Sequence, residues 1–218
     1  MQGPIYFINP NSLTHVTDGI ARTLAATARP SAVEFRCVTL RGAPPGIVSQ
    51  RDADKAAVLV SDFVEAHSAE ASGFVIACYS DPGLYAAQEV TTKPVVGIGY
   101  AALARASTLG ERIGVIAVSS RGIARHWRSY VMFGCAENIA GERAIDLTVA
   151  QSGDETVALE RLISTATGLR DEAHADVIVL GCAGMTRLRL QVEEAVGLPV
   201  VDPCIAGAAL IAQRVSKS

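Results

Sequence analysis

The sequence predicts an α/β fold of two similar halves, each a four-stranded parallel sheet flanked by helices, facing each other across a cleft. Half of the 218 residues are hydrophobic but only 5% are aromatic, so Ala, Val, Ile and Leu build the core, as in buried parallel sheets. Short β-branched runs alternate with longer, alanine-rich amphipathic stretches, the pattern of strands connected by helices. The order of these runs in the first half of the chain recurs in the second.

The predicted strands are short apolar runs, and the predicted helices lie between them. The strands are expected at Ile5–Ile8, Val33–Val38, Phe74–Ala77, Val95–Val96, Ile113–Val118, Ile145–Leu147, Val177–Leu180 and Val200–Val201. The helices are expected near residues 12–28, 51–71, 83–90, 100–108, 121–133, 153–173, 185–195 and 204–215. Parallel strands joined by helices take right-handed crossovers. A TIM barrel has the same alternation but usually needs about 250 residues.

The internal repeat favours two halves over a barrel. The run Phe74–Cys78 is followed by Pro94-Val95-Val96, and Val179–Cys182 is followed in the same way by Pro199-Val200-Val201. Each half therefore contains strand, helix, strand, helix, strand with cysteine, helix and Pro-Val-Val. We expect the first half to span residues 1–97 and the second residues 98–202, with the helix at 203–218 packing back onto the first half.

Composition excludes several classes of function. A net charge of −3 argues against nucleic acid or anionic lipid as the partner. No run of 18 apolar residues occurs, so no membrane span is expected. The N-terminal residues lack the basic region of a signal peptide, which predicts a cytoplasmic protein with reduced thiols. No His or Cys spacing matches a metal site, so we expect neither a metal nor another cofactor.

Five cysteines occur, and two of them occupy equivalent places in the repeat. Cys78 and Cys182 each follow an apolar strand and precede a helix, and the first of these helices is expected to begin with Pro82. Ligands of open α/β sheets bind beyond the carboxyl ends of the strands. The positive end of a helix at this place lowers the pKa of a thiol. The other three cysteines have no matched partner and are interpreted as structural: Cys37, Cys135 and Cys204.

Two thiols that approach a common cleft from opposite sides suit one reaction class. Inverting a carbon next to a carbonyl requires removing a proton from one face and delivering one to the other, and a thiolate with a thiol can do both. The enolate that develops needs hydrogen-bond donors. The candidates are backbone N–H groups after each cysteine and the hydroxyls of Ser80, Ser119 and Ser120 at strand ends.

Four strings of residues resemble one family. They are Ile8-Asn9-Pro10-Asn11-Ser12, Ala77-Cys78-Tyr79-Ser80-Asp81-Pro82-Gly83-Leu84, Pro94-Val95-Val96-Gly97-Ile98 and Leu180-Gly181-Cys182-Ala183-Gly184-Met185. Their order along essentially the whole chain resembles the Asp/Glu/hydantoin racemase superfamily, most closely its hydantoin and allantoin racemases. The resemblance implies two pseudo-symmetric flavodoxin-like halves, an active site in the cleft between them and no cofactor.

The resemblance also implies roles for individual residues. Cys78 and Cys182 would be the two acid/base residues of the reaction. The substrate-binding residues would be Asn9, Asn11, Tyr79, Ser80, Ser119, Ser120, Ala183 and Gly184. The substrate would be a small molecule, a hydantoin or related cyclic ureide, and the protein would be a homo-oligomer.

One departure from the family pattern leaves the substrate open. Gly99-Tyr100 stands before Ala101-Ala102, where the branch commonly has an acidic residue. Within the superfamily, the alternatives are a maleate-type cis–trans isomerase and an arylmalonate-type decarboxylase, although the decarboxylase uses a single cysteine. A third alternative, from another class, is a non-catalytic protein that binds a small molecule in the same cleft.

Two weaker patterns have ordinary explanations. The stretch Gly97–Ala102 fits G-x-G-x-x-A, but the next strand does not end in the carboxylate that a dinucleotide site requires. Arg121, Arg125 and Arg128 recur at helical spacing, which predicts a solvated helix face. With Trp127 and Tyr130, the alternative interpretation of this helix is a subunit contact.

Overall fold

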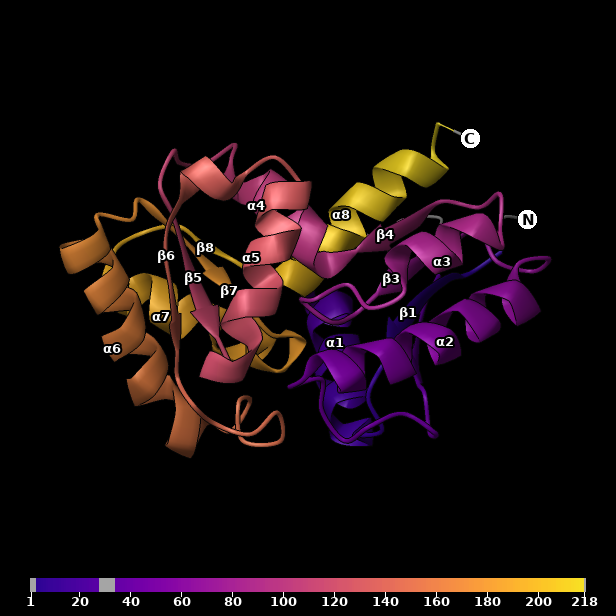
Figure 1. The fold of residues 1–218 in the computed structure, drawn as a ribbon, viewed down its shortest axis with the longest axis horizontal. Coiled ribbons are helices and arrows are strands. Elements are labelled where there is room, and N and C mark those ends of the chain that lie inside the picture. Colours follow the sequence, from indigo (N-terminus) through magenta and orange to yellow (C-terminus); the bar gives the residue numbers. More distant parts are fainter. Residues whose placement is uncertain (1–2, 28–33, 218) are drawn as a thin grey trace.

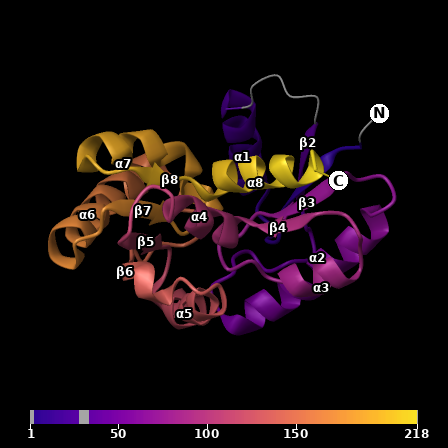
Figure 2. The same ribbon diagram turned by 90° about the horizontal axis from the view of Figure 1, so that it is seen from above.

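Two parallel sheets stand side by side in the computed structural model, which describes residues 3–27 and 34–217 (Figures 1 and 2). Their strand orders are β2-β1-β3-β4 and β6-β5-β7-β8, and all neighbouring strands are parallel. The strands are β1 (Ile5–Asn9), β2 (Phe35–Thr39), β3 (Gly73–Ile76), β4 (Val95–Gly97), β5 (Ile113–Ala117), β6 (Ile139–Ala144), β7 (Val177–Leu180) and β8 (Val200–Val201). The predicted α/β class with two four-stranded parallel sheets is confirmed.

Helices connect the strands and cover both faces of each sheet (Figure 1). The α-helices are α1 (Thr14–Thr27), α2 (Gln50–His67), α3 (Leu84–Glu89), α4 (Ile98–Ala106), α5 (Ile123–Met132), α6 (Glu155–Ala173), α7 (Arg189–Val196) and α8 (Pro203–Val215). Short 3-10 helices are η1 (Ser120–Gly122), η2 (Ala136–Asn138) and η3 (Ala183–Leu188). In the described part of the chain, no helix has the length and apolar character needed to cross a bilayer.

One strand lies elsewhere than predicted. The sixth strand is β6, Ile139–Ala144, and Ile145–Leu147 follows it as irregular backbone. Because β6 is an edge strand of its sheet, most of its residues are only half-buried and it carries charged side chains, including Glu142. The continuous apolar run that marks an inner parallel strand is therefore missing. Three predicted element ends, at Val33 and at residues 28 and 218, lie outside the described residues.

Alternate side chains of the first sheet enter two different cores. Ile5 and Phe7 pack with Val75 against α1 and α8. Tyr6 and Ile8 point to the opposite face and pack against α2 and α3. Figure 2 shows the two helix pairs on opposite sides of this sheet. The alternation follows from the period of two along a strand, and a strand buried on both faces needs apolar residues at every position.

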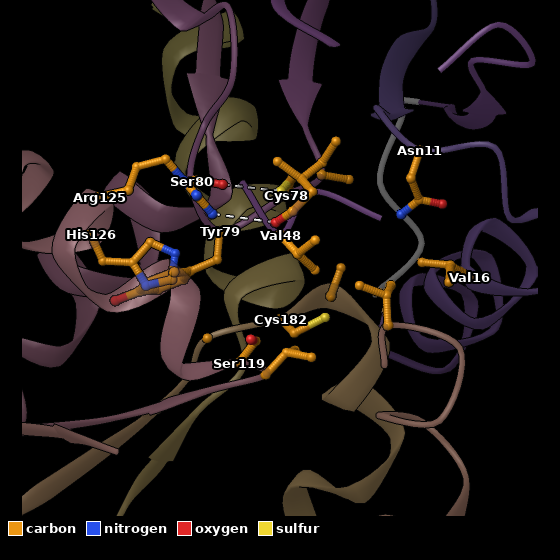
Figure 3. A pocket seen from close by; sticks show the side chains of 17 residues that line it. Asn11, Val16, Val48, Cys78, Tyr79, Ser80, Ser119, Arg125, His126 and Cys182 are labelled. Carbon is orange, nitrogen blue, oxygen red and sulfur yellow. Dashed lines mark hydrogen bonds between the residues drawn. The ribbon is translucent and has the colours of Figure 1, made fainter. Parts of the chain in front are cut away.

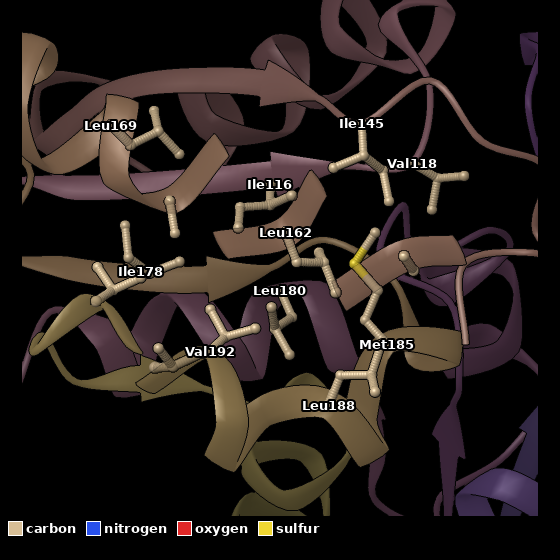
Figure 4. Packing of buried hydrophobic residues seen from close by; sticks show 14 of the residues in the cluster. Ile116, Val118, Ile145, Leu162, Leu169, Ile178, Leu180, Met185, Leu188 and Val192 are labelled. Carbon is tan, nitrogen blue, oxygen red and sulfur yellow. The ribbon is translucent and has the colours of Figure 1, made fainter. Parts of the chain in front are cut away.

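The second sheet repeats this arrangement. Ile116 and Ile178 pack against α6 and α7, in the core drawn in Figure 4. Val115 and Val179 point to the other face and pack against α4 and α5. The two halves are therefore similar in the placement of their helices as well as in strand order.

The helix after the last strand of each sheet crosses to the other sheet. Helix α4 directly follows β4 but packs against β7 and β8. Helix α8 follows β8 but packs against β3, β4 and α1, and α4 and α8 contact each other. Figure 1 shows α8 in yellow reaching from the second sheet to the first. The residue ranges assigned to the two halves stay a prediction.

Candidate active site

A pocket lies where the two halves meet, beyond the carboxyl ends of the strands (Figure 3). Loops after β1, β3, β5 and β7 contribute to it, because the carboxyl ends of parallel strands meet at one edge of a sheet. The predicted site residues that line it are Asn11, Cys78, Tyr79, Ser80, Ser119, Cys182 and Ala183. Much of the remaining wall is apolar and includes Val16, Val48, Val118 and Val149.

Three predicted site residues lie outside this lining. Asn9 is fully buried, and its side-chain NH₂ group contacts three acceptors of the chain that follows, at 3.2, 3.1 and 3.0 Å, the first of them Oδ1 of Asn11. Ser120 is exposed and donates its backbone N–H to Asp146 at 2.8 Å. Gly184 lines an adjoining hollow together with His15. Asn9 therefore shapes the loop that carries Asn11 without facing the pocket.

The first thiol has a hydroxyl neighbour. Cys78 follows β3 and is half-buried as a residue, and its sulfur lies 3.5 Å from the Oγ of Ser80. The loop then turns at Asp81, whose backbone N–H donates to the carbonyl of Cys78 at 2.9 Å. Ser80 is therefore held within hydrogen-bond range of the sulfur by a tight turn.

The end of this loop differs from the sequence prediction. Helix α3 begins at Leu84, after Gly83 in a left-handed conformation, so the prediction that Pro82 begins the helix is wrong. The physical reason is Asp81, which has a positive φ of 45° and turns its carboxylate away from α3. Its two oxygens accept the N–H groups of Gly99 and Tyr100 in the first turn of α4, at 2.9 and 2.8 Å.

The second thiol has a backbone donor. Cys182 is the N-cap residue of η3, and its Sγ accepts the N–H of Gly184 at 3.3 Å. The hydroxyl of Ser152 lies 3.7 Å from the same sulfur but donates its proton to the carbonyl of Val149 at 2.9 Å. The two thiols therefore face the pocket with different hydrogen-bond partners.

Burial dominates the acidity of both thiols. Loss of solvation raises the pKa of Cys78 to about 11, although the hydrogen bonds of Ser80 and the charge of Arg125 act in the opposite direction. Loss of solvation also raises the pKa of Cys182, against its hydrogen bond from Gly184. The expectation that helix N-termini lower these thiol pKa values is wrong, because an apolar pocket disfavours the charged form more than these donors favour it.

Two polar residues of α5 line the pocket without having been predicted as site residues, namely Arg125 and His126. Helical spacing predicts a solvated face for Arg125, but this side chain is only 9% exposed. The signal in the sequence is position: α5 follows the polar turn at the end of β5, so its first residues lie near the strand ends.

His126 belongs to a buried network behind the pocket. Its Nδ1 lies 2.6 Å from one carboxylate oxygen of Glu142, and the hydroxyl of Tyr130 donates to the other at 3.0 Å. The hydroxyl of Tyr79 lies 3.3 Å from that of Tyr130, and the Tyr79 ring packs edge-on against His126. The network fixes Tyr79 in the pocket wall. Tyr130 is part of this network and is buried, so its side chain does not lie on the surface.

The departure at Gly99-Tyr100 lies away from the pocket lining. Tyr100 packs edge-on against Phe133, with ring centroids 5.2 Å apart, and lines a different hollow. A Cβ atom on Gly99 would lie 1.9 Å from the carbonyl oxygen of Tyr79, so this position requires glycine. Neither residue of this departure therefore lines the pocket.

In the described part of the chain, the remaining cysteines and the acidic residues form no second candidate active site or metal site. Burial raises the pKa of Cys37 to about 11 and that of Cys204 well above its usual range. Neither these residues nor Cys135 line the pocket. Within residues 3–27 and 34–217, no group of three or more His, Cys, Asp or Glu side chains is placed to hold a metal ion.

Comparisons with known proteins cover both halves. A family model described as Asp/Glu/Hydantoin racemase matches residues 5–211. Hydantoin racemases from Pseudomonas sp. strain NS671 and Rhizobium meliloti are 33% and 34% identical, over 93% and 91% of this chain and 82% and 83% of those proteins. The solved structure of allantoin racemase from Klebsiella pneumoniae is 30% identical with a TM-score of 0.93, over 99% of this chain and 89% of that chain.

Proposed function

The chain belongs to the Asp/Glu/hydantoin racemase family, and from this premise we propose that it inverts the carbon next to a carbonyl in a hydantoin or a related cyclic ureide. The observation that carries the proposal is a single pocket lined by Cys78 and Cys182, each following the third strand of its own sheet. The names of the relatives support the substrate class, since hydantoin and allantoin are both cyclic ureides.

The reaction uses the two cysteines as a base and an acid. One thiolate removes the proton from the reacting carbon, and the thiol on the opposite side delivers a proton to the other face. With the opposite enantiomer the two residues exchange roles. The steps need only proton transfers between the substrate and Cys78 and Cys182, so no cofactor takes part in them.

The high thiol pKa values suit this role. A thiolate of Cys78, with a pKa of about 11 instead of the ordinary 9.0, binds a proton more tightly and is a stronger base toward a weakly acidic C–H group. The same shift leaves little thiolate at neutral pH. The hydrogen bonds from Ser80 and Gly184 offset part of this cost by stabilising whichever thiolate forms.

A cyclic ureide also suits the pocket. Its reacting carbon lies beside a ring carbonyl, and the ring lacks the free carboxylate whose charge would oppose carbanion formation. Asn11, Ser80 and Ser119 would bind the oxygens and N–H groups of the ring. The valine-rich wall would take an apolar side chain of the substrate.

The experiment is α-hydrogen exchange in deuterated solvent, followed by NMR with D- and L-hydantoins, allantoin, glutamate and aspartate. We expect exchange and inversion with cyclic ureides, and loss of racemisation in Cys78→Ala and in Cys182→Ala. Cys135→Ala, which removes a thiol outside the pocket, is the control and should retain activity. Unchanged racemisation in both pocket variants would refute the mechanism, and ligand binding without exchange would favour a non-catalytic binding protein.

The homo-oligomer is a second proposal. Three apolar side chains of α3 and α5 are strongly exposed, Tyr85 at 52%, Val131 at 68% and Met132 at 59%. Tyr85 and Met132 line one hollow, and apolar surface of this kind is commonly buried in subunit contacts. Sedimentation velocity should give a mass above the 22.8 kDa of one chain, and a monomer at micromolar concentration would contradict the proposal.

A further inference from the structure

The pocket contains a buried cation with an unused hydrogen-bond donor. Arg125 is 9% exposed, and its Nη2 donates to the carbonyl of Ile47 at 3.3 Å. Its Nε is buried and has no hydrogen-bond partner among the described residues. Figure 3 shows the guanidinium extending along the wall beside Ser80, toward the side of the pocket that carries Cys78.

Its neighbours on α5 have partners, which sets Arg125 apart. His126 lies 2.6 Å from the buried carboxylate of Glu142. Arg128 is exposed and donates to Gln50 at 2.7 Å. Arg125 forms no ion pair with any residue in the described ranges. The ionisable groups that act on it at longer range are Cys78, Asp52, Glu142 and Arg128.

A guanidinium without a counter-ion is costly to bury. Loss of solvation lowers the pKa of Arg125, which is the expected direction for a cation in an apolar environment. The penalty for such a charge is large unless a negative group compensates it. Since the chain supplies no ion-pair partner in its described part, an anion bound or formed in the pocket would be the contact counter-charge of Arg125.

In the proposed reaction, negative charge develops at one place on the substrate. A thiolate accepts the α-proton as the C–H bond breaks. The electron pair of that bond forms a carbon–carbon double bond, and the carbonyl π pair moves onto the oxygen. When the second thiol protonates the opposite face, the oxygen pair re-forms the carbonyl. The charge therefore passes from sulfur to oxygen and on to the second sulfur.

We infer that Arg125 is a catalytic residue whose guanidinium donates to the carbonyl oxygen next to the reacting carbon and stabilises it as an enolate oxyanion. The inference rests on the proposed function. A donor fixed in a pocket of low polarity is worth more than the same donor in water. Because Arg125 gains its counter-charge mainly in the transition state, it lowers the barrier more than it strengthens substrate binding.

The first test compares Arg125→Gln with Arg128→Gln, which removes a charge from the exposed face of the same helix. Losing one oxyanion donor typically costs about 10²–10³ in kcat, so Arg125→Gln should lose about that factor on 5-substituted hydantoins, with KM changed far less. Arg125→Lys keeps the charge without the planar guanidinium donors and should recover part of kcat. Arg128→Gln should match the wild type.

A kcat for Arg125→Gln within about twofold of the wild type, in a protein of unchanged Tm, would overturn the inference. An equal rise in KM with unchanged kcat would also overturn it, because the residue would then bind the ground state. If Arg125→Gln fails to fold, the same comparison is made with Arg125→Lys, for which we expect a smaller loss in kcat.

The second test measures binding and needs no turnover. Barbiturate is a cyclic ureide that is an enolate anion at neutral pH, whereas 5,5-dimethylhydantoin is neutral and has no hydrogen on its reacting carbon. By calorimetry, the wild type should bind barbiturate at least about tenfold more tightly, and Arg125→Gln should lose this preference. A preference that is absent from the wild type, or that survives in Arg125→Gln, contradicts the inference. A wild type without any α-exchange but with an Arg125-dependent preference would refute the proposed reaction and support the anion site.

Discussion

In the first half, the loop that carries the thiol caps a helix that packs against the other sheet. Asp81, three residues after Cys78, accepts N–H groups from Gly99 and Tyr100 at the start of α4. Each carboxylate oxygen takes one of these bonds. Helix α4 packs against β7 and β8, so the Cys78 loop is tied to the second sheet.

In the second half, the same link is made with different residues. Asp202 caps its own helix, α8, because its Oδ1 accepts N–H groups from Cys204 and Ile205 at 2.7 and 3.1 Å. The Cys182 loop reaches this cap through Thr186, whose hydroxyl donates to the same oxygen at 3.2 Å. Helix α8 packs against β3 and β4 of the first sheet.

The two halves share one feature of the repeat, a link from the thiol loop to a helix cap, although different residues form it. Gly97 and Asp202 both follow the Val-Val pair of their half, but the capping carboxylate has moved from this position into the thiol loop in the first half. The link from each thiol loop to a crossing helix is present in both halves. Each thiol loop is therefore tied to the cap of a helix that packs against the opposite sheet, and we expect the alignment of the two thiols to depend on these caps.

The largest effect on stability is expected from adding one methyl group at the end of β4, against the carboxylate of Asp81. In Gly97→Ala, the new Cβ would lie 2.1 Å from Cγ of Asp81, which is buried and doubly hydrogen-bonded. We expect a loss of about 3 kcal/mol or more in the free energy of unfolding, measured by urea denaturation. Gly19→Ala in α1, where nothing lies within 4 Å of the new Cβ, is the control and should be neutral or slightly stabilising. Equal effects of the two substitutions would show that the close approach of Asp81 and Gly97 is unimportant.

A smaller loss of stability should distinguish the two capping carboxylates, Asp81 and Asp202. Asp81→Asn places an NH₂ group against an N–H donor, because both oxygens of Asp81 are in use, and should cost about 1–3 kcal/mol above pH 7. Asp202→Asn should cost less than about 1 kcal/mol, since only Oδ1 accepts bonds and Oδ2 has no partner among the described residues. Denaturation at pH 8 measures both variants, and a larger cost for Asp202→Asn would reverse the comparison.

The pH dependence of the free energy of unfolding should reveal the raised pKa of Asp81. Burial raises the pKa of Asp81 from 3.8 to about 7. Between these values the folded chain keeps a proton that the unfolded chain releases, so the free energy of unfolding falls as pH rises, by up to about 1.4 kcal/mol per pH unit. Below the lower value the stabilisation is fully present, and above the higher value it is lost. The difference between wild type and Asp81→Asn isolates this slope, and a difference that does not change between pH 4 and pH 7 would contradict it.

The smallest effect concerns the partners of the thiols. Ser80→Ala removes a hydroxyl that can donate to the Cys78 thiolate, so the pKa of Cys78 should rise and alkylation by iodoacetamide below pH 9 should slow by up to about tenfold. Ser152→Ala should change the alkylation of Cys182 much less, because Ser152 donates to Val149 instead. Mass spectrometry follows each cysteine separately. If Ser152→Ala slowed the alkylation of Cys182 more than Ser80→Ala slows that of Cys78, the assignment of Ser80 as the hydroxyl donor to a thiolate would be wrong.

Local sequence patterns were enough to predict much of the fold and the pair of thiols. Buried parallel strands are nearly continuous apolar runs, so β1, β3, β5 and β7 could be located within a residue or two. The repeat then placed Cys78 and Cys182 at matching strand ends, and the structure brings both to one pocket. Strand β6 was missed because an edge strand is exposed on one side and tolerates charge.

Features that depend on distant contacts could not be predicted. The positive φ of Asp81 is stabilised by bonds to residues 99 and 100, far along the chain, so Pro82 gave a false helix start. The burial of Arg125 depends on the Ile47 loop of the other half packing against α5. Helical spacing alone cannot distinguish a solvated arginine from one that faces a pocket between two halves.

The most direct test of the two-base account is enantiomer-resolved hydrogen exchange in the two cysteine variants. Each variant should lose racemisation by about 10²–10⁴ while still exchanging the α-hydrogen of the one enantiomer that faces its remaining thiol, without inversion. Cys78→Ala and Cys182→Ala should therefore exchange opposite enantiomers in deuterated solvent. Exchange of the same enantiomer by both variants, or racemisation at the wild-type rate in either, would contradict the assignment of one thiol to each face.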